Sequence, residues 1–70
     1  MSGTMVAFIE APTMGEPRRV GPVVELDHLP NLRDTVATPD DRTLTVIQVD
    51  HYPWGLEGIA EGPYVEVTLR

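Results

Sequence analysis

Val46-Ile47-Gln48-Val49-Asp50-His51-Tyr52-Pro53-Trp54-Gly55 is the stretch that decides the predicted fold. Its first half belongs to residues 42–50, a segment rich in the β-branched residues that favour strands. Apolar side chains fall on both faces of this expected strand, Leu44 and Val46 on one face and Ile47 and Val49 on the other. A strand that is apolar on both faces belongs in the middle of a small barrel or sandwich. We therefore predict that residues 42–50 form a central strand.

The same pattern occurs once more, 23 residues earlier in the chain. Residues 19–41 align without a gap on residues 42–64. The six identical pairs are Arg19/Arg42, Val23/Val46, Asp27/Asp50, His28/His51, Pro30/Pro53 and Ala37/Ala60. Repetition at a fixed period usually means that one supersecondary unit is used more than once. We therefore expect His28 and His51 to lie at equivalent positions, at the ends of two strands, with matching side-chain directions.

The remaining segments also favour short strands separated by turns. Residues 20–27 alternate between apolar and polar side chains, and residues 32–38 form a weaker strand candidate. Proline and aspartate in Thr38-Pro39-Asp40-Asp41 are typical of a type I turn. In residues 64–70, strict alternation directs Val65, Val67 and Leu69 inward and Tyr64 outward.

No segment shows the sustained apolar spacing of a helix, and glycine and proline together make thirteen of the seventy residues (6 + 7). The predicted class is all-β, a small barrel or compact sandwich of five to six short strands with an extended N-terminal arm.

The N-terminal segment, residues 1–18, is predicted to be this arm, and residues 19–70 a single small β-domain built on the imperfect repeat. Residues 5–9 are apolar, and the segment after them contains two prolines that exclude a tight hairpin. The apolar side chains of the arm are Met5, Val6, Phe8 and Ile9. Their burial is worth roughly 1.5–3 kcal/mol each, so they must pack against protein. Either the arm adds a strand to its own sheet, or it adds one to the open edge of a neighbouring chain, which we favour.

Composition excludes several classes of function. The chain carries a net charge of −6, with five arginines and no lysine, whereas binding to nucleic acid or to an anionic membrane requires a basic surface. Its longest apolar runs are too short to span a bilayer. No basic segment precedes an apolar one at the N-terminus, so no secretory signal is expected and the predicted location is the cytoplasm or a virion. Cysteine is absent, which excludes disulfides and thiolate ligands.

The two Asp-His pairs, Asp27-His28 and Asp50-His51, are the strongest candidates for metal binding or catalysis. Histidine and carboxylate side chains bind zinc. Adjacent residues on a strand face opposite sides of the sheet, however, so neither pair chelates a metal without a bend. We predict no metal site and no cofactor. The chain also lacks a cysteine nucleophile and a glycine-rich phosphate loop, so we expect no catalytic residues and no enzymatic activity.

Tyr52-Pro53-Trp54-Gly55 is the second candidate, because it contains half of the four aromatic residues and the only tryptophan. Aromatic side chains on a proline-bearing loop are common anchors of protein interfaces. Alternatively, Trp54 folds back over one mouth of the barrel and completes the core. The candidate interaction residues are therefore Met5, Val6, Phe8, Ile9, Tyr52 and Trp54.

These observations predict a non-enzymatic structural or accessory subunit of a larger protein assembly. A virion component, either a capsid decoration or a tail-associated protein, suits the size and acidity of the chain. The partners are then other protein subunits, the same or different, and we expect an oligomer. The alternative is a small acidic inhibitor or regulator that binds one host protein through the loop at residues 52–55.

Overall fold

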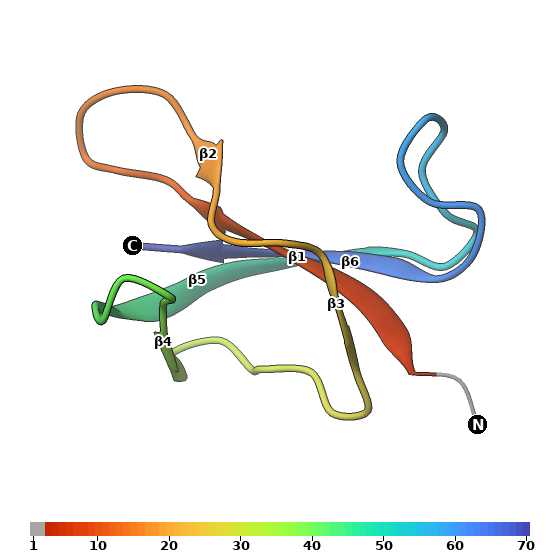
Figure 1. Cartoon of the computed structure of the whole chain (residues 1–70), viewed down its shortest axis with the longest axis horizontal. Helices are drawn as coiled ribbons and strands as arrows, with labels where there is room; N and C mark the ends of the chain where they lie inside the picture. The colour runs from red at the N-terminus through yellow and green to blue at the C-terminus, as the bar shows by residue number, and fades with distance from the viewer. Residues whose placement is uncertain (1–2) are drawn as a thin grey trace.

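A computed structural model of the chain describes residues 3–70. All regular elements of this part are strands, as predicted: β1 (Thr4–Glu10), β2 (Arg18–Arg19), β3 (Val24–Leu26), β4 (Thr35–Ala37), β5 (Thr43–Tyr52) and β6 (Tyr64–Leu69). They form one six-stranded sheet that curls into a half-barrel (Figure 1). Residues 3–70 contain no helix long and apolar enough to cross a membrane.

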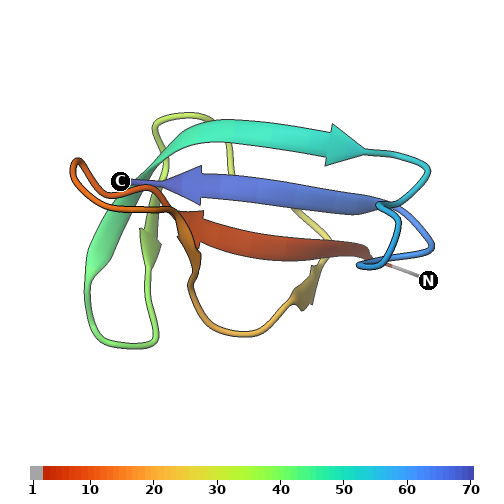
Figure 2. The same ribbon diagram turned by 90° about the horizontal axis from the view of Figure 1, so that it is seen from above.

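The sheet is built around three long strands. Its order is β2-β1-β6-β5-β4, and β3 pairs with β1 on the same side as β2. Figure 2 shows β1, β6 and β5 lying side by side, with the short strands curling away at both edges. β1 and β6 run parallel, whereas β5 is antiparallel to both β6 and β4. No pairing joins β3 to β4 among the described residues, so the barrel is left open at this seam.

The N-terminal segment corrects our prediction of an arm that reaches a neighbouring chain. Within residues 1–18, β1 is an internal strand, because it pairs with β6 on one side and with β2 and β3 on the other. The two prolines do exclude a tight turn, but the chain makes a wide loop over residues 11–17 and returns as β2. Residues 1 and 2 of the predicted arm lie outside the described residues. The N-terminal segment therefore adds a strand to its own sheet, which is the alternative that we did not favour.

The core lies on the concave face of the half-barrel. Its fully packed members come from β1, β5 and β6: Val6, Val46, Val65, Val67 and Leu69. Partly buried side chains of β1, β3, β4 and β5, and Leu29 of the 27–34 connection, pack against them. The inward alternation predicted for the last strand is confirmed, because Val65, Val67 and Leu69 are all buried. Tyr64 was expected to be exposed, yet it is also buried, on the opposite face of the sheet.

β5 differs from the predicted central strand at Ile47. The pairing with β6 shifts by one residue between Val46 and Gln48, which makes Ile47 the extra residue of a β-bulge. The bulge changes the phase of the alternation, so that Leu44, Val46 and Val49 all contribute to the core while Ile47 remains 40% exposed. β4 pairs only with the start of β5, at Thr43–Thr45, and within residues 3–70 no strand pairs with the outer edge of β5 beyond Ile47. Ile47 is therefore not a core residue, although a central strand that is apolar on both faces was expected to bury it.

The 23-residue repeat does not produce two equivalent structural units. The first copy forms β3, a strand of 3 residues that pairs with β1. The second copy contains all of β5, a strand of 10 residues that pairs with β6. His28 lies in a bend after β3, whereas His51 lies inside β5. Both histidines therefore lie at or just beyond the end of a strand, as expected, but not at equivalent positions, because His28 follows β3 and His51 belongs to β5.

An ion-pair network closes one end of the half-barrel. The guanidinium of Arg42, at the start of β5, donates two hydrogen bonds to the Glu10 carboxylate at the end of β1, at 2.8 and 2.9 Å. The same guanidinium also donates to Asp40 at 2.9 Å. Asp40 belongs to the predicted turn, in which the amide of Asp41 donates to the Thr38 carbonyl. Hydrogen bonding by Arg42 lowers the pKa of Glu10, against the opposing effect of its burial.

Candidate protein-binding site

The connection between β5 and β6, residues 53–63, projects from one end of the sheet, and we call it the Trp54 loop (Figure 1). Its backbone is held by its own hydrogen bonds. The amide of Gly55 donates to the carbonyl of Tyr52 at 3.0 Å, which closes a turn around Pro53 and Trp54. Leu56 and Ala60 exchange two backbone hydrogen bonds, each of 2.9 Å. The loop therefore has a defined shape.

Gly55 is essential to this shape. Its φ of 84° lies in the left-handed region that glycine adopts without steric cost. A Cβ at this position would clash with the carbonyl oxygen of Ala60, because real Cβ atoms essentially never approach backbone atoms so closely. The two arms of the loop approach each other this closely only because position 55 has no side chain.

Trp54 lies at the tip of this turn with its side chain 90% exposed. The interpretation of Trp54 as a plug of the core is therefore wrong. Trp54 lies in the turn that the Gly55–Tyr52 hydrogen bond closes, and the core is completed without it. Ile59, on the other arm of the loop, is 56% exposed. The Trp54 loop thus presents two large apolar side chains to solvent.

Tyr52 supports the loop instead of forming its tip. Its ring packs on that of Tyr64, with the ring centroids 5.8 Å apart. The two tyrosines form the residue pair of β5 and β6 that lies nearest the loop. The Tyr64 hydroxyl donates to Glu66 at 3.1 Å. Burial is the main reason that the pKa of Tyr64 is raised, and the bond to Glu66 adds to it. The tyrosine pair anchors the base of the Trp54 loop on the face opposite the core.

The four candidate residues of the N-terminal segment are divided between the two faces of β1. Val6 is fully buried in the core, and Phe8 packs against the same cluster. Met5 and Ile9 lie on the opposite face, where Met5 is partly exposed. Because neighbouring residues of a strand point to opposite faces, these four side chains do not form one surface. Val6 and Phe8 belong to the core, whereas Met5 lies beside Tyr64 on the opposite face, near the base of the Trp54 loop.

The Asp-His pairs lie in different elements. His28 is in a bend after β3, and His51 is near the end of β5, where it lines a hollow with residues 29–32. Residues 3–70 contain no group of three or more potential metal-ligating side chains close enough to hold an ion.

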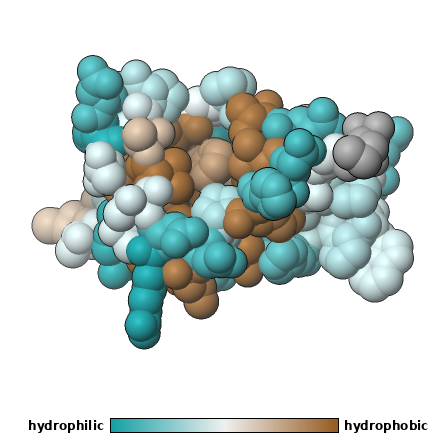
Figure 3. Space-filling model, turned by 90° about the horizontal axis from the view of Figure 1, so that it is seen from below, coloured by the Kyte–Doolittle hydropathy of each residue, from teal (hydrophilic) through white to brown (hydrophobic). Residues whose placement is uncertain are grey.

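An apolar pocket, which no sequence pattern predicted, lies at the open seam of the half-barrel. It has a volume of about 160 Å³. Its lining comes from β1, the 20–24 segment, β4 and its turn, and the end of β6: Phe8, Val20, Pro22, Val24, Val36, Ala37, Pro39 and Leu69 are among these residues. We call this the seam pocket. Figure 3, which views the molecule from below, shows apolar side chains exposed between hydrophilic ones on that face.

Sequence reasoning identified neither Ile59 nor the seam pocket. For Ile59 there was a signal, because it is an apolar residue in a segment that Gly55, Gly58 and Gly62 mark as a loop. The seam pocket had no such signal, because four segments distant in the sequence form it.

Comparison with models of protein families found no match, and comparisons with curated proteins and with solved structures found none that was significant.

Proposed function

We propose that this protein is a non-enzymatic, protein-binding subunit of a larger protein assembly, and that the Trp54 loop is its contact. The observation that supports this most directly is the 90% exposure of Trp54 on a loop held by its own hydrogen bonds. Tryptophan is among the residues most enriched at the energetic centres of protein interfaces. A loop that already has its bound shape loses little conformational entropy on binding, which favours affinity.

The charge of the chain indicates what kind of partner surface fits. Residues 43–69, which contain β5, the Trp54 loop and β6, carry Asp50, Glu57, Glu61 and Glu66 and no arginine or lysine. A complementary surface therefore has an apolar hollow for Trp54 and cations around it. The small size and acidity that suit a capsid decoration or a tail-associated protein suit other assemblies equally, so the proposal concerns the class of function.

An acidic inhibitor or regulator of one host protein is the second candidate, supported by the same acidic loop. The two candidates differ in what Trp54 contacts. A subunit contacts a stable component of a multisubunit particle, whereas an inhibitor contacts one protein in a discrete complex.

Photo-cross-linking tests the proposal. Trp54 is replaced by the photoreactive residue p-benzoylphenylalanine, in cells that naturally produce the protein. The control carries the same residue in place of Met14, which is also highly exposed but lies in the 11–17 loop. We expect a discrete adduct from position 54 only, competed by excess wild-type chain and not by Trp54→Ala. Equal adducts from the two positions, or none from position 54, would overturn the proposal.

A further inference from the structure

The Trp54 loop and the seam pocket lie toward opposite ends of the molecule, which is 33 Å long. In Figure 1 the loop lies at the right, while β2, β4 and the C-terminus lie at the left. The pocket lies between the chain that joins β2 to β3 and the strand β4. Because the loop is held in place, Trp54 does not reach the seam pocket of its own molecule. It can reach the seam pocket of a second copy.

The size of the seam pocket matches an aromatic ring. Its volume is about 160 Å³ and its exposed lining is mainly apolar. Apolar cavities of about 150 Å³ hold a benzene molecule. The pocket therefore accepts one ring of an indole, and Trp54 is the only tryptophan of the chain and its most exposed aromatic side chain.

Charges around the two surfaces are complementary. A hollow that shares Val20, Gly21 and Pro39 with the seam pocket is also lined by three arginines and two carboxylates, namely Arg18, Arg19, Arg42, Glu10 and Asp40. Arg42 is engaged by Glu10 and Asp40.

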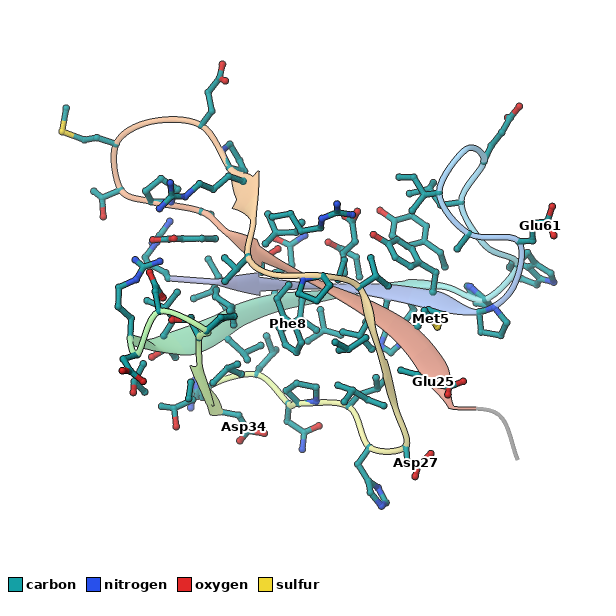
Figure 4. The ribbon with its side chains drawn as sticks, in the orientation of Figure 1. Met5, Phe8, Glu25, Asp27, Asp34 and Glu61 are labelled. Carbon is teal, nitrogen blue, oxygen red and sulfur yellow. The ribbon has the colours of Figure 1, made fainter. Side chains whose placement is uncertain are left out.

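The other two arginines remain accessible. Arg18 is 71% exposed, with a single contact of 3.6 Å to Glu10. Arg19 is exposed and makes no ion pair with the described residues. The Trp54 loop carries Glu57 and Glu61, and Figure 4 shows Glu61 at the end of the molecule remote from Asp34. An acidic loop with an apolar tip thus faces an apolar pocket with cations at its rim when two copies meet head to tail.

We propose that the partner of the Trp54 loop is a second copy of this chain, with Trp54 of one copy in the seam pocket of the next. Glu57 and Glu61 then lie close to Arg18 and Arg19 of that copy. This inference rests on the proposed function and names its partner. Because the two surfaces are different and lie at opposite ends, the contact is heterologous and repeats from copy to copy into a ring or an open chain.

The open edge of β5 is the competing route to self-association, and its own features oppose it. The bulge at Ile47 interrupts the edge, and Asp50 and His51 follow it. Bulges and charged side chains are devices that keep sheet edges from pairing with other chains. Contact through the loop therefore explains more of the structure than edge pairing does.

Two variants, each lacking one of the two surfaces, test the inference. Trp54→Ala removes the anchor and leaves the pocket intact. Ala37→Glu places a charge at an exposed position of the pocket lining and leaves the loop intact. The unmodified chain and both variants are compared by sedimentation velocity from micromolar to millimolar concentration, and circular dichroism checks that all three are folded.

The unmodified chain is expected to associate with rising concentration, and less so at high salt, which screens the carboxylate–arginine contacts. Each variant alone should need a concentration at least about 30-fold higher than the unmodified chain to associate, which is the loss typical of an interface anchor. A mixture of the two variants should form dimers and nothing larger, because one intact loop and one intact pocket remain. Fluorescence from Trp54 should shift to shorter wavelength on association of the unmodified chain and stay unshifted in Ala37→Glu alone.

Three results overturn the inference: a monomeric wild-type chain at millimolar concentration, association of Trp54→Ala equal to that of wild type, or a monomeric mixture. Failure here is distinct from failure of the proposed function. If the chain is monomeric but position 54 cross-links to a different protein, the second copy is excluded and the protein-binding role stands. If it is monomeric and position 54 forms no adduct, both proposals fail.

Discussion

Single side chains show how little of this molecule is true core. Leu69 is fully buried on β6, between β1 and β5, whereas Ile47 on the bulge is partly exposed. Both are large aliphatic residues in strands, and the difference between them comes from one shifted residue pair. Burial at a given position therefore depends on the register of the neighbouring strand as much as on the residue type.

Leu69→Ala should lower the free energy of unfolding by about 2–5 kcal/mol, because it leaves a cavity that flanking strands cannot fill. A chain this small is only marginally stable, so the variant should be largely unfolded. Ile47→Ala is the matched control and should cost less than about 1 kcal/mol, because its side chain already contacts solvent. Urea denaturation measures both. Equal losses for the two variants would mean that the bulge does not set the burial of Ile47.

Glu10 should make the protein less stable in acid. Arg42 holds the pKa of Glu10 below its ordinary value, so the folded state binds the proton less tightly than the unfolded state does. The contribution of this carboxylate is therefore complete above the unfolded pKa of about 4.3 and is lost as the pH falls through the lower folded value.

Denaturation of wild type and Glu10→Gln at neutral and acid pH tests this contribution. The stability difference between them should shrink as the pH falls below about 4. Glu16→Gln, at an exposed position of the 11–17 loop, controls for the loss of one negative charge. A difference that is independent of pH would show that Glu10 and Arg42 do not pair in solution.

At the scale of elements, the Trp54 loop is the part whose shape depends on one residue. Gly55 permits both the left-handed backbone and the close approach of Ala60, whereas Gly58, with a φ of 80°, has no atom within 4 Å of its Cβ position. The same residue type therefore has two different roles within one loop.

Gly55→Ala should break the hydrogen bonds between Leu56 and Ala60, and Gly58→Ala should not. At position 58 the cost is backbone strain alone, about 1–2 kcal/mol, while at position 55 a steric clash adds to it. Amide hydrogen exchange at Leu56 and Ala60 reports on those bonds directly. Retained protection in Gly55→Ala would mean that the loop tolerates a side chain there by a rearrangement that the structure does not show.

The whole molecule depends on β1, since this strand joins β6 to β2 and β3. A chain beginning at Arg19 lacks β1 and should therefore be unfolded, as circular dichroism and light scattering would show. The control is a chain beginning at Gly3, which keeps β1 entire and should fold. A folded chain beginning at Arg19 would instead restore the interpretation of residues 1–18 as a separable arm.

The sequence by itself determined the all-β class, the turn at residues 38–41 and the inward side chains of the last strand. These features depend on local chemistry, namely the dihedral limits of proline, β-branched side chains and an alternation of period two. It also identified Trp54 as the residue of interest, because a single tryptophan in a proline-bearing loop has few roles. The sequence did not determine whether the Trp54 side chain is buried or exposed.

Only the tertiary structure decided the partner of β1, the bulge at Ile47, the exposure of Trp54 and the seam pocket. Each depends on which strands pair and in what register. One shifted residue pair moves a side chain from the core to solvent, and no local pattern records that shift. The 23-residue repeat shows the limit most clearly, since similar segments beside different partner strands form a strand of 3 residues in one copy and one of 10 in the other. The physical reason is that pairing between segments distant in the sequence, within one curled sheet, sets the length of each strand and the burial of its side chains.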